Sequence, residues 1–109
     1  MIDINYLGPH APHYPSTPAA WYADRYNDAK APKTPNYNKS DSNKHAFVGT
    51  NPFITENASW WIDQLYRDRL RSLLSVDDLV KDIVELLNQY PTEMDNTYIL
   101  YTSDHGYHC

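Results

Sequence analysis

Residues 103–108 combine a carboxylate with two imidazoles directly after a short apolar run. Asp104 and His105 can give one oxygen and one nitrogen ligand to a divalent cation, and Gly106 permits the tight backbone turn that lets both side chains converge. The same Asp-His-Gly order is also common in plain turns, where the side chains serve only the backbone. By itself the cluster leaves both interpretations open.

A second polar cluster lies near the N-terminus, where residues 9–18 hold four prolines together with His10 and His13. Proline lacks the backbone donor that helices and sheets use, so this segment must be an ordered loop or a linker. Lys44 and His45 form a smaller pair that is also typical of an exposed surface. No cysteine or histidine pair has the spacing of a structural zinc site, which argues against that kind of site.

The composition argues against two classes of partner. The chain has 109 residues and a formal net charge of -5, and its few basic residues are scattered or alternate with acidic ones. A nucleic-acid-binding protein presents a basic patch, so we expect no nucleic-acid partner. No apolar run approaches the ~20 residues that a membrane span requires, so we expect no membrane span.

Two glycosylation sequons favour a secretory protein. Asn38 and Asn57 each stand two residues before a serine, which is the pattern of an N-glycosylation acceptor. The single cysteine, Cys109, is the last residue of the chain, so no internal disulfide is possible.

The clearest periodicity runs over residues 59–90. Apolar side chains recur there at three- and four-residue steps, which places them on one broad face of a helix. Arg67, Asp68 and Arg71 are among the charged residues that fill the other side. Because Ser75 and the acids after it resemble a helix start, the segment is either one helix or two with a kink. Either way, its apolar face needs a sheet or other helices to cover it.

Short strands are predicted on both sides of this helix. Residues 2–7 alternate apolar and polar side chains, and residues 97–102 form a β-branched and aromatic run. Between the first strand and the helix we expect one or two helical turns in residues 19–28 and an irregular loop over residues 29–57. Strand, long helix and strand predict an α/β fold with parallel strands. Ligands in such folds bind beyond the carboxyl ends of the strands, and each of the two polar clusters follows a predicted strand.

Several segments, taken together and in order, match one family. They are residues 11–19, 31–33, 36–38, 43–45, 69–80 and 96–108. Over nearly its whole length the chain therefore resembles the sulfatases, in particular the N-acetylglucosamine-6-sulfatases and the related heparan endosulfatases. The last two segments are specific to that family, whereas the proline-rich one alone is not.

The resemblance implies an alkaline-phosphatase-like α/β sandwich and hydrolysis of sulfate esters on glycosaminoglycan-type sugars. In that family a formylglycine, made from the cysteine of a Cys-x-Pro-Ser-Arg motif, attacks the sulfur of the ester. A calcium ion polarises the sulfate oxygens, while lysine and histidine side chains bind the sulfate and protonate the departing alcohol. The implied location is the lysosome or the extracellular space.

The family's functional residues carry over to particular positions. By resemblance, Asp104 and His105 match the late pair of calcium ligands, whose second member is Asn or His in the family. His13 matches the histidine near the sulfate and is the expected proton donor to the leaving oxygen, whereas His10 has no secure counterpart. The residues assigned to the pocket rim or to contacts with the substrate are Lys44, His45, Tyr107 and His108.

The chain also departs from the family pattern. The Cys-x-Pro-Ser-Arg motif, the early pair of calcium-binding aspartates and a later lysine of the sulfate site are absent. Cys109 is not a substitute, because the motif's proline and arginine do not follow it. We therefore expect residues 1–109 to be an inactive part of a sulfatase catalytic domain, cut from a larger α/β domain, with the formylglycine elsewhere in the parent protein.

Two alternative functions stay open at this point. A phosphodiesterase or phosphatase of the same superfamily would use Asp104 and His105 to bind zinc instead of calcium. A non-catalytic module would keep a pocket for sulfated sugars without the chemistry. The upstream nucleophile distinguishes these possibilities, because a threonine or serine there would favour phosphoryl transfer.

Overall fold

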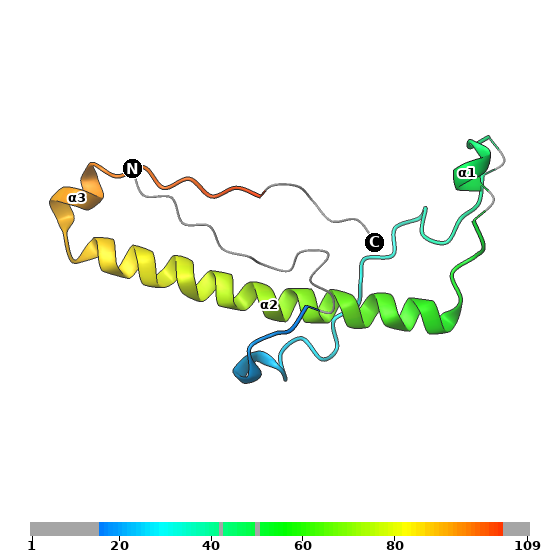
Figure 1. Ribbon diagram of the computed structural model, residues 1–109, viewed down its shortest axis with the longest axis horizontal. Coiled ribbons are helices and arrows are strands. Elements are labelled where there is room, and N and C mark those ends of the chain that lie inside the picture. The colour runs from blue at the N-terminus through cyan, green and yellow to red at the C-terminus, as the bar shows by residue number, and fades with distance from the viewer. Residues whose placement is uncertain (1–15, 42, 50, 104–109) are drawn as a thin grey trace.

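One long helix, α2 (Glu56–Asn88), dominates the computed structural model (Figure 1). The residues that the structure describes are 16–41, 43–49 and 51–103. The other helices among them are the 3₁₀ helix η1 (Ala20–Tyr22), α1 (Ala46–Gly49) and α3 (Pro91–Asp95). At a rise of ~1.5 Å per residue α2 is about 50 Å long, so it accounts for most of the 60 Å length of the molecule.

The ends of α2 follow from its sequence. Thr55 precedes the helix, and its side-chain oxygen accepts a hydrogen bond from the backbone N–H of Ala58 at 3.2 Å, which is an N-cap. Glu56 adds a negative charge to the first turn, where the helix dipole favours it. Tyr90 leaves the helical conformation, with φ -127° and ψ 76°, because a residue before proline is disfavoured in the helical region. The predicted helix is confirmed, and the alternative of a second helix starting near Ser75 is wrong.

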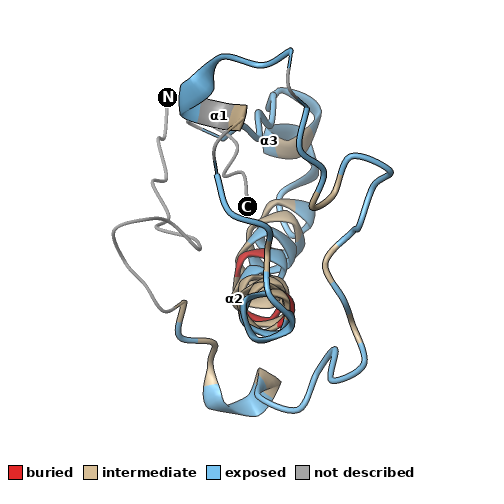
Figure 2. Ribbon diagram, turned by 90° about the vertical axis from the view of Figure 1, so that its right-hand side faces the viewer, coloured by how far each residue is buried: buried red, intermediate tan, exposed pale blue. Residues whose placement is uncertain are grey.

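The residues of α2 differ in how far they are buried by the rest of the chain. Figure 2 looks nearly along this helix and shows buried residues on it alone. Within the described part the buried residues are Asp63 and Arg71, each 8% exposed, and Val76, 9% exposed. On the apolar face, Leu73 and Leu86 remain 39% and 55% exposed. The expectation that a sheet or other helices cover this face is therefore not met by the described residues.

The dimensions of the molecule agree with this picture. Its radius of gyration is 19.0 Å, whereas a compact domain of this length has about 13 Å. A compact domain buries its apolar side chains in one shared core, and Val76 is the single buried hydrophobic residue in the part of the chain that the structure describes. The molecule is a long helix with loops laid against it.

The predicted strand over residues 97–102 is wrong for this structure. These residues form no strand, and Tyr98 and Leu100 are 95% and 92% exposed. A strand requires a neighbour that pairs with its backbone N–H and C=O groups, and residues 16–41, 43–49 and 51–103 contain none. The other predicted strand, residues 2–7, lies outside the described residues. The α/β sandwich with parallel strands is thus not seen, while its long amphipathic helix is.

The remaining predictions of local structure agree with the structure. Residues 19–28 contain the helical turn η1, and residues 29–57 are irregular where described, apart from α1 and the first residues of α2. No described helix is long and apolar enough to cross a membrane.

Candidate functional site

Residues 20–38, which we call the strap, run along α2 in the opposite direction (Figure 1, blue to cyan). Polar contacts join Tyr22 to Asp78, Arg25 and Asn27 to Arg71, Ala29 to Arg67, Ala31 and Lys33 to Asp63, and Tyr37 to Ser59. On α2 these partners are four or seven residues apart, a spacing that keeps them on one side of a helix. The strap therefore covers the polar side of α2.

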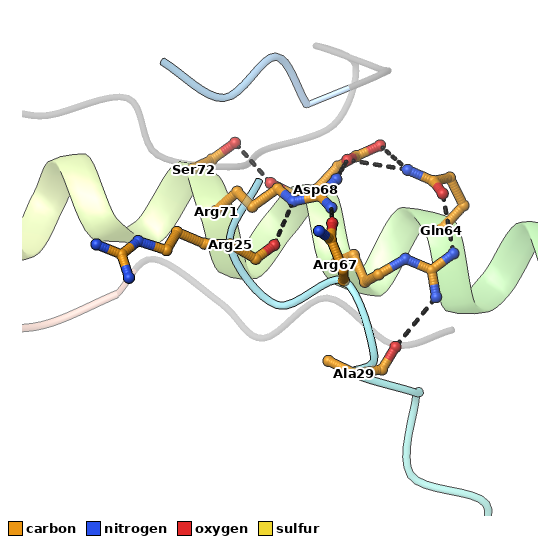
Figure 3. A network of polar contacts seen from close by, with 8 residues as sticks. Arg25, Ala29, Gln64, Arg67, Asp68, Arg71 and Ser72 are labelled. Carbon is orange, nitrogen blue, oxygen red and sulfur yellow. Dashed lines mark hydrogen bonds and ion pairs between the residues drawn. The ribbon is translucent and has the colours of Figure 1, made fainter. Parts of the chain in front are cut away.

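Arg71 makes two polar contacts with the strap (Figure 3). Its Nε donates to the carbonyl of Arg25 at 2.7 Å, and its Nη2 donates to Oδ1 of Asn27 at 2.8 Å. Its Nη1 donates to Oδ1 of Asp68, one turn back on α2, at 2.8 Å. A planar guanidinium presents several donors at fixed angles, which suits this arrangement. The carboxylate of Asp68 neutralises the charge and so makes its burial tolerable.

Arg67 holds the next part of the strap. Its Nη1 donates to the carbonyl of Ala29 at 3.1 Å, and its Nη2 donates to Oε1 of Gln64 at 2.9 Å. The amide of Gln64 in turn donates to both carboxylate oxygens of Asp68 at 3.1 and 3.2 Å. Figure 3 shows that these bonds link Arg67 and Arg71 into one network. Backbone carbonyls of the strap are thus bound by charged donors from α2.

The contact furthest along α2 joins the hydroxyl of Tyr22 to Asp78. The hydroxyl donates to Oδ2 at 2.5 Å. This hydrogen bond, together with burial and the negative charge of Asp78, raises the pKa of Tyr22. The phenol therefore keeps the proton on which the contact depends.

Asp63 binds the strap nearer the start of α2. Its Oδ1 accepts a hydrogen bond from the backbone N–H of Ala31 at 3.0 Å, and the ammonium of Lys33 lies 3.5 Å from its Oδ2. Burial by itself raises the pKa of Asp63, but the bond from Ala31 and the charges of Lys33 and Arg67 outweigh burial. The pKa of Asp63 is therefore lower than its usual value of 3.8.

This pKa predicts how the strap responds to acid. Because the folded pKa of Asp63 is the lower one, its stabilising contribution is present above the unfolded pKa of 3.8 and is lost as the pH falls through the folded value. Asp63→Asn should therefore lower the melting temperature near neutral pH and reduce its fall in acid. Thermal unfolding followed by circular dichroism from about pH 6 to about pH 2 tests this. The matched control is Asp82→Asn at an exposed position of α2; equal curves for the two variants would contradict the assignment.

Lys44 and His45 are exposed in the turn that precedes α1. Nδ1 of His45 accepts a hydrogen bond from the backbone N–H of Phe47 at 3.3 Å, so the imidazole caps the first turn of this short helix. The backbone N–H of Lys44 donates to the carbonyl of Asp41 at 3.1 Å. Neither side chain is brought to another predicted site residue within the described part. Their assignment to the rim of a substrate pocket stays a prediction.

The other predicted site residues, His13, Asp104, His105 and His108, lie outside the described residues, as do His10, Tyr107 and Cys109. Among residues 16–41, 43–49 and 51–103, no three His, Cys, Asp or Glu side chains are grouped so as to hold a metal ion. The calcium site and the meeting of the two polar clusters stay predictions.

The sequence predicts no role for the polar side of α2. Arg67 and Arg71 are expected on the side opposite the apolar face, without a partner for either. One signal was available, because Ser59, Asp63, Arg67 and Arg71 follow one another at four-residue steps. Half of their partners on the strap are backbone groups, which cannot be recognised in the sequence.

The strap also borders a surface hollow of about 450 Å³ lined by Lys30, Tyr37, Asn38 and Trp60, among others.

The family model for sulfatases matches residues 1–109, which is the whole chain. The chain belongs to the sulfatase family. The resemblance that the sequence motifs indicate is thereby confirmed.

Relatives within the sulfatase family show how much of such a protein is present. N-acetylglucosamine-6-sulfatase of Homo sapiens is 41% identical over 100 residues, which cover 90% of this chain and 18% of the relative. Sulfatase ppz1 of Metarhizium majus is 34% identical over 113 residues, covering 99% of this chain and 27% of the relative. A putative extracellular sulfatase Sulf-1 homolog of Caenorhabditis elegans is 32% identical over 99 residues, covering 90% and 14%. The chain therefore spans less than a third of these relatives, and no solved structure matches it significantly.

Proposed function

We propose that residues 1–109 are part of the catalytic domain of a sulfatase that removes sulfate from glycosaminoglycan-type sugars. The observation that carries this proposal is the match of the sulfatase family model to the whole chain. The relative that is 41% identical is named for N-acetylglucosamine 6-sulfate, and we propose the same class of substrate here. The rest of the full-length enzyme would complete an alkaline-phosphatase-like sandwich and supply the formylglycine, so this chain alone should be inactive.

Asp104 and His105 are the proposed calcium ligands of this chain in the full-length enzyme. A carboxylate oxygen suits a hard cation such as calcium, whereas an imidazole nitrogen suits zinc better. The chemistry of this pair therefore supports a cation site and leaves the choice of ion to measurement. A calcium ion held there would polarise the oxygens of the sulfate ester.

The remaining proposed roles concern the proton and the sugar. His13 would hold a proton on its imidazole and give it to the departing alcohol oxygen, which is general acid catalysis. The cationic side chain of Lys44 would attract the sulfate, and His45 and His108 would bind sugar hydroxyls. The strap follows the His13 segment directly in the sequence, so its attachment to Arg67 and Arg71 fixes the chain on one side of that histidine.

We also propose that the full-length enzyme passes through the secretory route, to the lysosome or the extracellular space. The relatives from Caenorhabditis elegans and Drosophila melanogaster are named as extracellular sulfatases.

A substrate panel tests the proposed function on the full-length enzyme. We expect turnover of N-acetylglucosamine 6-sulfate and of the activated aryl ester 4-methylumbelliferyl sulfate, and little turnover of the corresponding phosphodiester. Hydrolysis of the phosphodiester alone would overturn the proposal in favour of a phosphoryl-transfer enzyme. Binding of sulfated sugars without turnover of any ester would instead indicate a non-catalytic module.

The same panel resolves the role of His13. His13→Ala should lower kcat by ~100-fold or more for the sugar sulfate and by much less for the aryl sulfate, because a general acid matters least when the alcohol leaves easily. His10→Ala, in the same segment but without a counterpart in the family, is the matched control and should change neither rate. Equal losses of His13→Ala on both esters would remove the proton-donor role.

A further inference from the structure

The two glycosylation sequons differ in what their asparagines do in the folded chain. Asn57 is exposed in the first turn of α2, and its side chain makes no hydrogen bond within the described residues. Asn38 is half-buried at the end of the strap, where the oxygen and the nitrogen of its side-chain amide each make one hydrogen bond. We propose that the folded enzyme carries an N-glycan on Asn57 and none on Asn38, because a glycan on Asn38 is incompatible with the clamp that its amide forms in front of α2.

Asn38 binds both backbone groups of one residue. Its Oδ1 accepts a hydrogen bond from the N–H of Ile54 at 2.6 Å, and its Nδ2 donates to the carbonyl of Ile54 at 3.1 Å. Its own backbone φ is 53°, in the left-handed region, which asparagine adopts more readily than most side chains do. Ile54 directly precedes Thr55, the N-cap of α2. The clamp therefore joins the end of the strap to the start of the long helix.

A glycan on Asn38 would break this contact. N-glycosylation replaces one of the two hydrogens on Nδ2 and produces a secondary amide. In the favoured form of such an amide, the substituent on nitrogen lies on the same side as the carbonyl oxygen, as in a trans peptide. The hydrogen that Asn38 donates to Ile54 is the one on that side, because Oδ1 and Nδ2 face the same residue. The sugar would take its place, and the opposite amide isomer is strongly disfavoured.

Asn57 has none of these restraints. The N-cap bond of the first turn runs from Ala58 to Thr55, so the helix does not need the side chain of Asn57. Figure 1 places this end of α2 at one extremity of the molecule, on the opposite side from α3. A glycan on Asn57 would displace none of the described contacts.

Glycan mapping on the full-length enzyme, secreted from eukaryotic cells, tests the proposal. Enzymatic release of N-glycans in heavy-oxygen water converts each modified asparagine to an isotope-labelled aspartate, which peptide mass spectrometry detects. We expect the label at Asn57 and none at Asn38. Asn57→Gln should remove the mass of one glycan, and Asn38→Gln should leave the glycan mass unchanged. A label at Asn38 in the folded, secreted enzyme, or no label at Asn57, would overturn the proposal.

A second measurement tests the clamp without any glycan. Asn38→Asp keeps the acceptor for the N–H of Ile54 but places a carboxylate oxygen against the carbonyl of Ile54, so it should lower the melting temperature. Asn57→Asp is the matched control: it places a charge in the first turn of α2, where the helix dipole favours it, so it should not lower the melting temperature. An equal fall in both variants would contradict the clamp. The glycan map rests on the proposed secretory route but not on sulfate hydrolysis, so the two proposals can fail separately.

Discussion

Replacing Asp104 with alanine in the full-length enzyme should abolish sulfate-ester hydrolysis, with kcat lowered by well over ~100-fold. Loss of a residue that merely orients a metal ligand costs ~10–100-fold in affinity or activity, and Asp104 is proposed to touch the cation itself. Without its carboxylate, the site loses negative charge that holds the cation and, with the cation, the polarisation of the sulfate. The measurement is steady-state hydrolysis of N-acetylglucosamine 6-sulfate, together with the calcium content of the purified variant.

Two further variants make this result specific. Asp104→Asn keeps one oxygen ligand without the charge, so part of the activity should return as the calcium concentration is raised. Asp95→Ala removes an exposed carboxylate of α3 a short distance upstream and should leave both rate and calcium content unchanged. Unaltered kinetics of Asp104→Ala would show that this aspartate serves only the turn. Restoration by zinc and not by calcium would favour the phosphoryl-transfer relative.

Arg71→Ala should be the most destabilising single substitution among the described residues, at about 3 kcal/mol in the free energy of unfolding. The guanidinium is buried and joins the carbonyl of Arg25, the amide of Asn27 and the carboxylate of Asp68. Alanine leaves these three acceptors without the charged donor that brought them together, and unsatisfied buried groups are costly. Denaturant unfolding of the full-length enzyme measures the loss of stability. Limited proteolysis within the strap measures how far the strap is released from α2.

The controls for Arg71 separate charge from geometry. Arg71→Lys keeps the charge but loses the planar fork, so it should recover only part of the loss. Lys81→Ala breaks an exposed pair on the same helix, in which Lys81 and Glu85 lie 3.7 Å apart with side chains 67% and 61% exposed, and should cost ~0.5 kcal/mol or less. Equal destabilisation by Arg71→Ala and Lys81→Ala would mean that the strap does not depend on the buried network.

The sequence predicts α2 and the family, but it does not predict that the apolar run at residues 97–102 forms no strand. The run has the β-branched and aromatic side chains of a strand, yet Tyr98 and Leu100 are almost fully exposed. Strand propensity depends on packing against neighbours, so it changes with what surrounds the segment. For the candidate site, family motifs point to His13, Asp104 and His105, which lie outside the described residues.

The sequence by itself predicted a long helix over residues 59–90, which the structure shows as α2 over residues 56–88, because helix periodicity and the effect of a following proline act within the same segment. It also determined the family, through motifs that can be read in order along the chain. Only the tertiary structure decided that the strap lies on the polar side of α2, and that the side chain of Asn38 is hydrogen-bonded while that of Asn57 makes no hydrogen bond within the described residues. The physical reason is that Arg67 and Arg71 bind carbonyls 38 and 46 residues away. Every residue type carries the same backbone carbonyl, so no pattern of side chains predicts such a contact.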